Sequence, residues 1–240
     1  PPPMSCRRQR QMCIRDRSIT KTYTIGEQPV RVLDDVSFSV SSGEFLVVNG
    51  SSGSGKSTLL SLLSGLDQPS SGRIILNEID ITDMTEDELA PMRNELFGFV
   101  FQSFHLVPSL TALENIMFPA ELKQDRDAYT KATRLLDRVG LRNRSDNFPH
   151  QLSGGEKQRV AICRALINSP KIIFADEPTG NLDTQNGQAI LELLLELQKE
   201  RKTTLILVTH SPELAAVAER VITLQDGRIS AEYSNNAQPK

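Results

Sequence analysis

The sequence predicts an α/β fold built around a parallel sheet, and two patterns support this prediction. Four short runs rich in β-branched and aromatic residues are almost entirely apolar, which is typical of strands covered by helices on both faces. Between them, leucines and isoleucines recur three and four residues apart, as on one buried face of a helix. An antiparallel sheet exposed on one side would alternate apolar and polar residues. The four runs are residues 44–49, 97–101, 171–175 and 204–209.

Two flanking parts complete the predicted architecture. Residues 30–40 and 72–81 contain short alternating strands with turn residues, which favours an antiparallel β subdomain beside the parallel core. Residues 103–150 contain no strong strand pattern, and we expect a helical subdomain over about residues 103–160.

Length and composition fit one soluble globular unit. The chain has 240 residues, of which 38% are hydrophobic and 24% are charged. No apolar stretch approaches the roughly 20 residues that a membrane-spanning helix needs. The net charge is −3, but five arginines against one aspartate give the first 17 residues a charge of +4 and leave −7 for the rest. Because nucleic-acid binding depends on positive charge, this acidic body predicts no nucleic-acid partner.

The two ends of the chain are expected to lie outside the folded domain, which we place at residues 18–233. Residues 1–17 lack the apolar stretch of a signal peptide, and their string MCIRDR resembles a translated sequencing adapter. We therefore interpret them as a disordered, non-native leader, with a basic arm that touches membranes as the alternative. Residues 234–240 are polar, and we expect a flexible tail. The three cysteines, Cys6, Cys13 and Cys163, show no metal-ligand spacing, which fits a reduced, cytosolic compartment.

A glycine-rich loop with the sequence GSSGSGKS follows the first apolar run and precedes a leucine-striped helix. Its glycines let successive backbone N–H groups turn toward one anion, and the helix N-terminus adds its positive end. Lys56 can reach the terminal phosphates, and the Ser57 hydroxyl can hold Mg²⁺. The context favours nucleotide binding over a merely flexible loop. The expected nucleotide-binding residues here are Gly50, Ser51, Ser52, Gly53, Ser54, Gly55, Lys56, Ser57 and Thr58.

A second candidate partner for the phosphates is the acidic pair that ends the third apolar run. Asp176 is placed to support Mg²⁺, and Glu177 to polarise a water that attacks the γ-phosphate. Taken alone, such a pair could equally be a solvated turn.

The segment LSGGE, residues 152–156, precedes another helix and offers a second anion-binding N-terminus. One nucleotide does not need two such cradles in one subunit. We therefore predict a head-to-tail homodimer in which this segment closes over the γ-phosphate bound near Lys56 of the other copy. The residues expected to make this contact are Ser153, Gly154, Gly155 and Glu156.

These motifs, in this order, resemble the ATP-binding cassette (ABC) family, whose signature segment is LSGGQ-like. The resemblance covers about residues 18–230, and Glu156 in place of the commoner Gln is a frequent variant. It implies a P-loop NTPase with a RecA-like parallel core sheet, an antiparallel β subdomain and a helical subdomain. It also implies an ATPase that uses ATP and Mg²⁺.

The same resemblance implies roles for further residues. Tyr23 matches the aromatic residue that stacks on adenine, and Asp183 matches the loop that contacts the opposite subunit. Gln102 matches the glutamine that senses Mg²⁺ and the attacking water, and His210 the switch histidine that touches the γ-phosphate. The expected catalytic residues are Lys56, Gln102, Glu177 and His210, and the expected Mg²⁺ ligands are Ser57, Gln102 and Asp176.

Three segments resemble the lipoprotein-releasing and macrolide-export branch of the family, with the cell-division member also similar. They are GFVFQSFHLVPSLTALENI, FADEPTGNLD and VTHSPELA, while Ser51 replaces a usual Pro and Cys163 a common Ala. The branch implies a peripheral protein on the cytoplasmic face of the inner membrane, with a permease on a separate chain. It implies export or extraction of lipoprotein, peptide or macrolide-type substrates.

Other functions remain open at this point. The alternatives are force transmission to envelope hydrolases through a membrane partner, and a soluble cassette that acts on DNA or ribosomes. A small-molecule kinase would leave LSGGE, Gln102 and His210 without a role. For the permease contact the candidates are Phe104, Leu106, Val107 and Leu110, and ordinary core packing is the alternative for these four.

Overall fold

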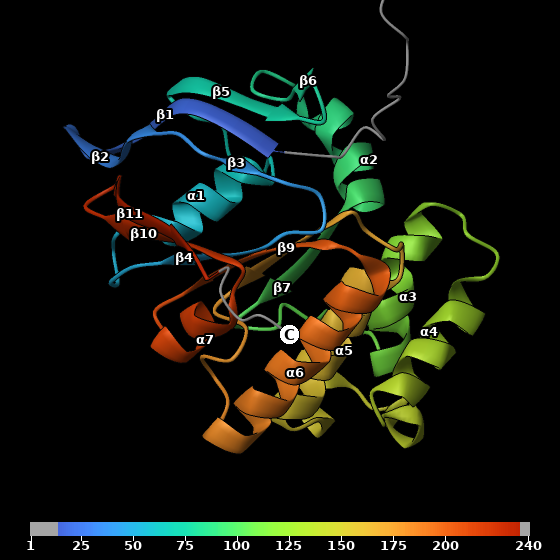
Figure 1. Cartoon of the computed structure of the whole chain (residues 1–240). Coiled ribbons are helices and arrows are strands. Elements are labelled where there is room, and N and C mark those ends of the chain that lie inside the picture. Colours follow the sequence, from blue (N-terminus) through green and yellow to red (C-terminus); the bar gives the residue numbers. More distant parts are fainter. Residues whose placement is uncertain (1–13, 236–240) are drawn as a thin grey trace, which may run out of the picture.

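The computed structural model describes residues 14–235, and its centre is a six-stranded sheet of order β11-β10-β4-β9-β8-β7 (Figure 1). The five strands from β10 to β7 are parallel, and β11 joins the edge as an antiparallel hairpin with β10. The parallel core expected from the four apolar runs is therefore confirmed. The strands are β4 Phe45–Asn49, β7 Phe97–Phe101, β8 Ile172–Asp176, β9 Thr204–Thr209, β10 Arg220–Gln225 and β11 Arg228–Ser234.

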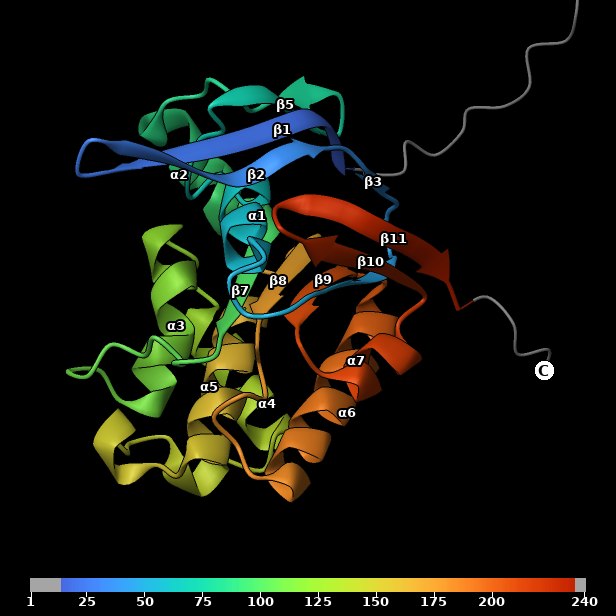
Figure 2. The same cartoon turned by 90° about the vertical axis from the view of Figure 1, so that its left-hand side faces the viewer.

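A second, antiparallel sheet lies apart from the first, and helix α1 (Lys56–Leu63) runs between the two sheets (Figure 2). The leucines of α1 are buried in one cluster with apolar residues of both sheets, because both faces of this short helix are covered. The expected β subdomain is thus present. Its strands are β1 Ile14–Ile25, β2 Gln28–Val36, β3 Ser39–Val40, β5 Ser71–Leu76 and β6 Ile79–Asp80.

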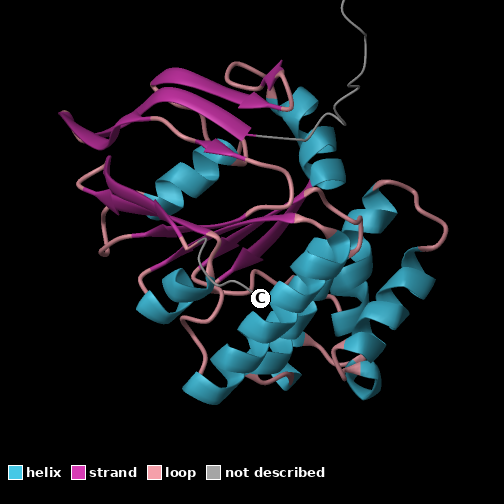
Figure 3. Cartoon of the chain, viewed as in Figure 1, coloured by secondary structure: helices cyan, strands magenta, loops and turns pink. Residues whose placement is uncertain are grey.

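Most of the other helices cover the opposite face of the central sheet and extend away from it (Figure 3), whereas α2 lies on the same side as α1, with Leu89 in the same buried cluster as the α1 leucines. Helix α5 packs against both α3 and β7, so it joins the helical part to the sheet, and it continues beyond residue 160 to Leu166. The helices are α2 Glu86–Leu96, α3 Ala112–Leu122, α4 Ala128–Arg138, α5 Gly154–Leu166, α6 Thr184–Arg201 and α7 Pro212–Val217, with 3₁₀ turns η1 Arg142–Arg144 and η2 Pro149–Gln151.

The starts of two of these helices are encoded locally. Thr111 precedes α3, and its hydroxyl accepts from the Glu114 backbone N–H at 3.3 Å. The Glu114 carboxylate accepts in return from the Thr111 backbone N–H at 2.8 Å. Ser153 and Glu156 form the same reciprocal pair at the start of α5. Such a capping box satisfies N–H groups that have no partner inside the helix.

The boundaries of the folded domain differ from those expected. Residues 14–17, which the sequence places in the leader, form the start of β1 and pair with β5, where Ile14 lies opposite Leu76. Ile14 and Asp16 are buried while the arginines between and after them are exposed. This alternation over four residues is too short to identify without its pairing partner. At the other end Asn235 donates to the carbonyl of Ala218, and residues 1–13 and 236–240 lie outside the described residues.

Among residues 14–235, no helix combines the length and apolar character that crossing a bilayer requires.

Candidate functional site

A cavity of about 720 Å³ lies at the carboxyl ends of the parallel strands. Parallel strands bring these ends to one edge of the sheet, so segments far apart in sequence meet there. The cavity unites the phosphate loop (residues 50–57), the acidic pair after β8 and the polar residues that follow β7 and β9. Its lining is Val32, Ser52, Gly53, Gly55, Lys56, Ser57, Thr58, Gln102, Asp176, Glu177 and His210.

Lys56 is held by the loop that precedes it. Its Nζ donates to the carbonyl oxygens of Gly50 at 2.9 Å and Ser51 at 2.8 Å, and the residue is buried. Ser54 is buried as well, and its hydroxyl has no hydrogen-bond partner within the described part of the chain. Gly50, Ser51 and Ser54 are not among the residues that line the cavity, and the ammonium group of Lys56 bridges the start of the loop.

Two glycines of the loop are required by geometry. Gly55 precedes α1 with φ 100°, a left-handed conformation that favours glycine. At Gly50 an added Cβ would lie 2.3 Å from the carbonyl oxygen of Leu224, so β10 leaves no room for a side chain. The loop can therefore form its turn and approach β10 closely only with glycine at these positions.

Ser57 and Asp176 meet across the cavity, with Ser57 Oγ donating to Asp176 Oδ1 at 3.2 Å. Burial raises the pKa of Asp176 and the nearby Glu177 carboxylate adds to this, while the Ser57 hydrogen bond and Lys56 act against it. A hydroxyl and a carboxylate, with the Gln102 side chain in the same lining, form an all-oxygen donor set of the kind that Mg²⁺ prefers. The residues present therefore fit this metal.

Glu177 has φ 45°, a left-handed conformation uncommon for a residue with a side chain. Its Oε1 lies 2.8 Å from His210 Nδ1, and its Oε2 accepts from the Thr209 hydroxyl at 3.3 Å. The strained backbone thus directs the carboxylate across the edge of the sheet from β8 to the residues at the end of β9. Strain of this kind is concentrated at functional sites.

Gln102 is positioned by Asn181, which belongs to the run of residues 180–183 that resembles the loop contacting the opposite subunit. The Gln102 amide nitrogen Nε2 lies 3.3 Å from Asn181 Oδ1, and Asn181 Nδ2 donates to the Gln102 carbonyl at 2.9 Å. An added Cβ on Gly180 would lie 2.8 Å from Gln102 Nε2. Only the spatial proximity of residues 102 and 181 identifies this pair.

The signature segment is not part of the cavity lining within the described residues. Ser153 precedes α5 and accepts from the Glu156 backbone N–H at 3.3 Å, and Arg144 Nε lies 3.2 Å from Glu156 Oε1. The hydrogen bond from the Ser153 backbone N–H lowers the pKa of Glu156 despite its partial burial. Gly154 and Gly155 form the first turn of the helix, so one subunit does not bring this segment to its own phosphate loop.

Asp183 also lies outside the lining and precedes α6. Its carboxylate accepts from the Asn186 backbone N–H at 2.9 Å and from the Asn186 side chain at 2.6 Å. These bonds lower the pKa of Asp183. In a single subunit Asp183 is therefore occupied as a helix cap.

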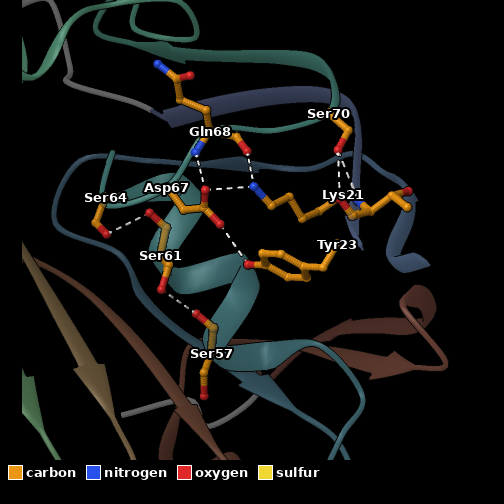
Figure 4. A network of polar contacts seen from close by, with 9 residues as sticks. Lys21, Tyr23, Ser57, Ser61, Ser64, Asp67, Gln68 and Ser70 are labelled. Carbon is orange, nitrogen blue, oxygen red and sulfur yellow. Dashed lines mark hydrogen bonds and ion pairs between the residues drawn. The ribbon is translucent and has the colours of Figure 1, made fainter. Parts of the chain in front are cut away.

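Tyr23 lies on β1 and is 37% exposed, beside the cavity rather than in its lining. Its hydroxyl donates to Asp67 Oδ2 at 2.7 Å, and Lys21 Nζ lies over its ring (Figure 4). Neither Lys21 nor Asp67 belongs to a sequence motif, so sequence analysis alone does not identify them.

Comparisons with known proteins agree with this geometry. The sequence model of the ABC transporter family matches residues 33–180. The lipoprotein-releasing system ATP-binding protein LolD of Shewanella oneidensis is 46% identical over 221 residues, which cover 91% of this chain and 96% of that relative. The macrolide export ATP-binding/permease protein MacB of Chlorobaculum tepidum is 49% identical over 211 residues, 88% of this chain. The chain spans about a third of the length of this and similar macrolide-export relatives.

A solved structure shows the same fold. The dimeric post-hydrolysis state of the ATP-binding cassette MJ0796, bound to ADP and Pi, has a TM-score of 0.87 at 39% identity and covers 94% of this chain and 100% of its own. The motif order, the cavity and these matches agree. The chain therefore belongs to the ABC transporter family, with LolD and MacB among its relatives.

Proposed function

We propose that two copies of this chain bind two Mg·ATP between them and that hydrolysis of the γ-phosphate reopens the dimer to drive a membrane partner. One observation carries this proposal. The phosphate loop, Asp176, Glu177 and His210 converge on one cavity, while the signature segment lies outside it.

The phosphates would be held by the loop. Lys56 donates to the Gly50 and Ser51 carbonyls, and the terminal phosphates would replace these two acceptors. The backbone N–H groups of the loop and the N-terminus of α1 would contribute further donors. Thr58, in the first turn of α1, lines the same cavity.

Mg²⁺ would be held by Ser57 and Asp176, with Gln102 as the third protein group. When bound, it neutralises charge on the β- and γ-phosphates. The fold brings these two ligands together, because Ser57 Oγ donates to Asp176 across the cavity.

Hydrolysis would depend on Glu177 and His210. The Glu177 carboxylate would accept a proton from the attacking water, since its position at the sheet edge faces the site of the γ-phosphate. His210 lies 2.8 Å from that carboxylate and would orient it while contacting the γ-phosphate. Gln102, held by Asn181, would place the water and the metal relative to each other.

The second copy would complete the site with its signature segment and Asp183. Ser153 is exposed and Gly154 and Glu156 are half-buried, so this helix start would contact a phosphate of the partner through them, while Gly155 is buried in the first turn. The dimeric state of the related MJ0796 cassette supports this arrangement.

A permease on a separate chain would be the membrane partner, with this protein peripheral on the cytoplasmic face of the inner membrane. The names of LolD and MacB support a role in the release or export of lipoprotein, peptide or macrolide-type substrates. An apolar groove of about 390 Å³ between the sheet and the helical part offers a contact surface, lined among others by Phe99, Phe101, His105, Phe118 and Leu122.

This groove differs from the permease contact expected from the sequence. None of Phe104, Leu106, Val107 and Leu110 lines it, and Leu106 packs against the core cluster instead. His105, between Phe104 and Leu106, lines the groove instead.

The substitution Glu177→Gln tests the shared site. It should reduce ATP hydrolysis by about 10²- to 10⁴-fold while leaving nucleotide binding intact, because it removes only the proton acceptor. With Mg·ATP the variant should elute from a size-exclusion column as a dimer. Glu213→Gln, an exposed glutamate in the first turn of α7, is the matched control. Elution of the Glu177→Gln variant only as a monomer would contradict the proposal.

The membrane partner needs a separate experiment. A tagged chain should copurify with an integral membrane protein from detergent-solubilised membranes, and Phe118→Asp in the groove should abolish this without changing nucleotide binding. Loss of nucleotide binding in the same variant would indicate a folding defect, and unchanged copurification would exclude the groove as the contact surface.

A further inference from the structure

The Tyr23 ring is fixed by two contacts that the proposed hydrolysis does not use. Its hydroxyl donates to Asp67 Oδ2 at 2.7 Å, and Lys21 Nζ lies 4.8 Å from the ring centroid. Figure 4 shows the lysine side chain and the carboxylate converging on the ring from β1 and from the turn after α1. A phenol held only by packing could rotate about its two side-chain bonds, whereas this ring is held at its hydroxyl and covered on one face.

Asp67 is itself held firmly. Its Oδ1 accepts from Lys21 Nζ and from the Gln68 backbone N–H, both at 2.7 Å. Lys21 Nζ also donates to the Gln68 carbonyl at 2.6 Å, and the Asp67 backbone N–H donates to the Ser61 carbonyl at 3.2 Å. These hydrogen bonds from Lys21, Tyr23 and Gln68 outweigh the effect of partial burial and lower the pKa of Asp67. The carboxylate is therefore ionised at neutral pH.

Helix α1 connects this network to the phosphate loop. The helix begins at Lys56 and carries a ladder of serines, in which Ser61 donates to the Ser57 carbonyl at 2.9 Å and Ser64 to the Ser61 carbonyl at 3.1 Å. Asp67 follows this helix directly and contacts its last turn (Figure 4). One short rigid element therefore fixes the distance between the phosphate-binding residues and the Tyr23 ring.

The two faces of the ring are not equivalent. The Lys21 side chain, only 12% exposed, covers one face, while Tyr23 as a whole is 37% exposed. A flat aromatic ligand can therefore stack only on the uncovered face. A base stacks on the π-face of an aromatic side chain, so the position of the ring decides where the base can bind.

We propose that Lys21 and Asp67 are positioning residues for the nucleobase, which hold the Tyr23 ring so that a purine base stacks on its open face while the phosphates occupy the loop at the other end of α1. The inference rests on the proposed nucleotide site. It adds a base-binding end to that site, which would distinguish a nucleotide from a bare polyphosphate. The alternative is that the ion pair only fastens β1 to the turn after α1.

Two ligands separate these roles in the full-length chain. ADP carries both base and phosphates, inorganic tripolyphosphate carries phosphates alone, and neither requires hydrolysis or dimer closure. With both measured by calorimetry in the presence of Mg²⁺, Asp67→Ala should weaken ADP binding by about three- to tenfold, the effect of one lost hydrogen bond. Tripolyphosphate affinity should change less than twofold. Asp80→Ala, which removes a carboxylate bonded to Thr82 in the same sheet, should change neither affinity.

A double variant tests whether Asp67 acts through the ring. In a Tyr23→Ala background, Asp67→Ala should cause no further loss of ADP affinity, because there is no ring left to orient. Tyr23→Phe keeps the ring and removes only its hydroxyl, so it should show part of the loss of ADP affinity seen in Asp67→Ala. If Asp67→Ala does not fold, Tyr23→Phe supplies the measurement.

Three outcomes would overturn the inference or its basis. Equal weakening of ADP and tripolyphosphate, or an Asp67→Ala effect that persists without the Tyr23 ring, would assign the pair a structural role only. An unchanged ADP affinity in Asp67→Ala and Tyr23→Phe would exclude any role in base binding. Failure of the unaltered protein to bind either ligand would instead contradict the proposed nucleotide site itself.

Discussion

Glu177 and His210 lie side by side at the ends of two adjacent parallel strands, with Glu177 Oε1 2.8 Å from His210 Nδ1. The register of β8 and β9 places Asp176 opposite Val208, and each of the two residues directly follows the last residue of its own strand. The left-handed backbone of Glu177 turns its carboxylate toward the histidine. Neither the sequence around Glu177 nor the sequence around His210 specifies this contact alone, because the contact depends on the pairing of the two strands.

Loss of His210 should therefore impair hydrolysis more than binding. His210→Ala removes the partner that orients the Glu177 carboxylate, and we expect kcat to fall by about a hundredfold with little change in KM for ATP. Steady-state phosphate release measures this. His150→Ala, in the 3₁₀ turn before the signature segment, is the control. An equal loss of kcat in both variants would show that His210 has no specific role in hydrolysis.

Replacement of Lys56 should act on binding. Lys56→Ala removes a charged donor, so nucleotide affinity should fall by roughly ten- to hundredfold. Competition with a fluorescent ATP analogue measures this affinity. Lys131→Ala, an exposed lysine of α4 paired with Asp125, should leave it unchanged. Unchanged affinity in Lys56→Ala would contradict its contact with the phosphates.

Arg164 of α5 should stabilise the segment that follows Gln102. Its guanidinium donates to the Phe104 carbonyl at 2.9 Å and the His105 carbonyl at 2.6 Å, and both of these residues have positive φ. Lys cannot reproduce this forked contact, so Arg164→Lys should lower the free energy of unfolding by about 1–2 kcal/mol. Urea denaturation measures the change, with Arg134→Lys on the exposed face of α4 as control. Equal free energies of unfolding for the two variants would show that the hydrogen bonds from Arg164 to the Phe104 and His105 carbonyls do not stabilise the fold.

The stability of the fold should depend on the pH through Asp16. Burial raises the pKa of this carboxyl from 3.8 to about 7, against the opposing hydrogen bond from the Phe38 backbone N–H and the charge of Arg220. Over this range the carboxyl is protonated in the folded state and ionised in the unfolded state. The free energy of unfolding therefore falls as the pH rises from 3.8 through 7.

Asp16→Asn removes this loss of stability at high pH. The free energy of unfolding of the variant should exceed that of the unaltered chain at pH 8, and this excess should be on the order of 2 kcal/mol larger at pH 8 than at pH 5. Urea unfolding at both values measures the difference. The same gain at both pH values would show that Asp16 does not titrate in this range.

The phenol of Tyr23 provides a spectroscopic readout. Burial raises its pKa, and the neighbouring Asp67 carboxylate adds to the effect. Asp67→Asn should therefore lower the pKa of Tyr23, measured by phenolate absorbance. The chain has no Trp and three Tyr, so Tyr129→Phe with Tyr233→Phe isolates the signal. An unchanged pKa of Tyr23 would show that the Asp67 carboxylate does not influence the ionisation of the phenol.

The fold class and the position of the phosphate site followed from the sequence because both are local properties. An apolar run of five residues bounded by turn residues is typical of a buried strand, and GSSGSGKS has the spacing of a phosphate-binding loop in the few residues of one motif. The parallel core, the antiparallel β subdomain and the family membership are confirmed accordingly. The roles of individual site residues stay predictions.

The start of the folded domain could not be predicted in this way. Residues 14–17 become a strand only because β3 and β5 supply hydrogen-bond partners on either side. A short charged segment without such partners has no reason to be extended. The predicted leader therefore loses its last four residues to β1.

The sequence by itself determined which chemical groups this protein has for the proposed binding and cleavage of a phosphate anhydride, since each motif spans only a few residues. Only the tertiary structure decided which distant groups meet them: Asp176 at Ser57, Asn181 at Gln102, and Asp67 at Tyr23. These pairs are 44 to 119 residues apart in the chain. Their contact depends on strand order and helix packing, which arise from the burial of the whole core and from no single segment.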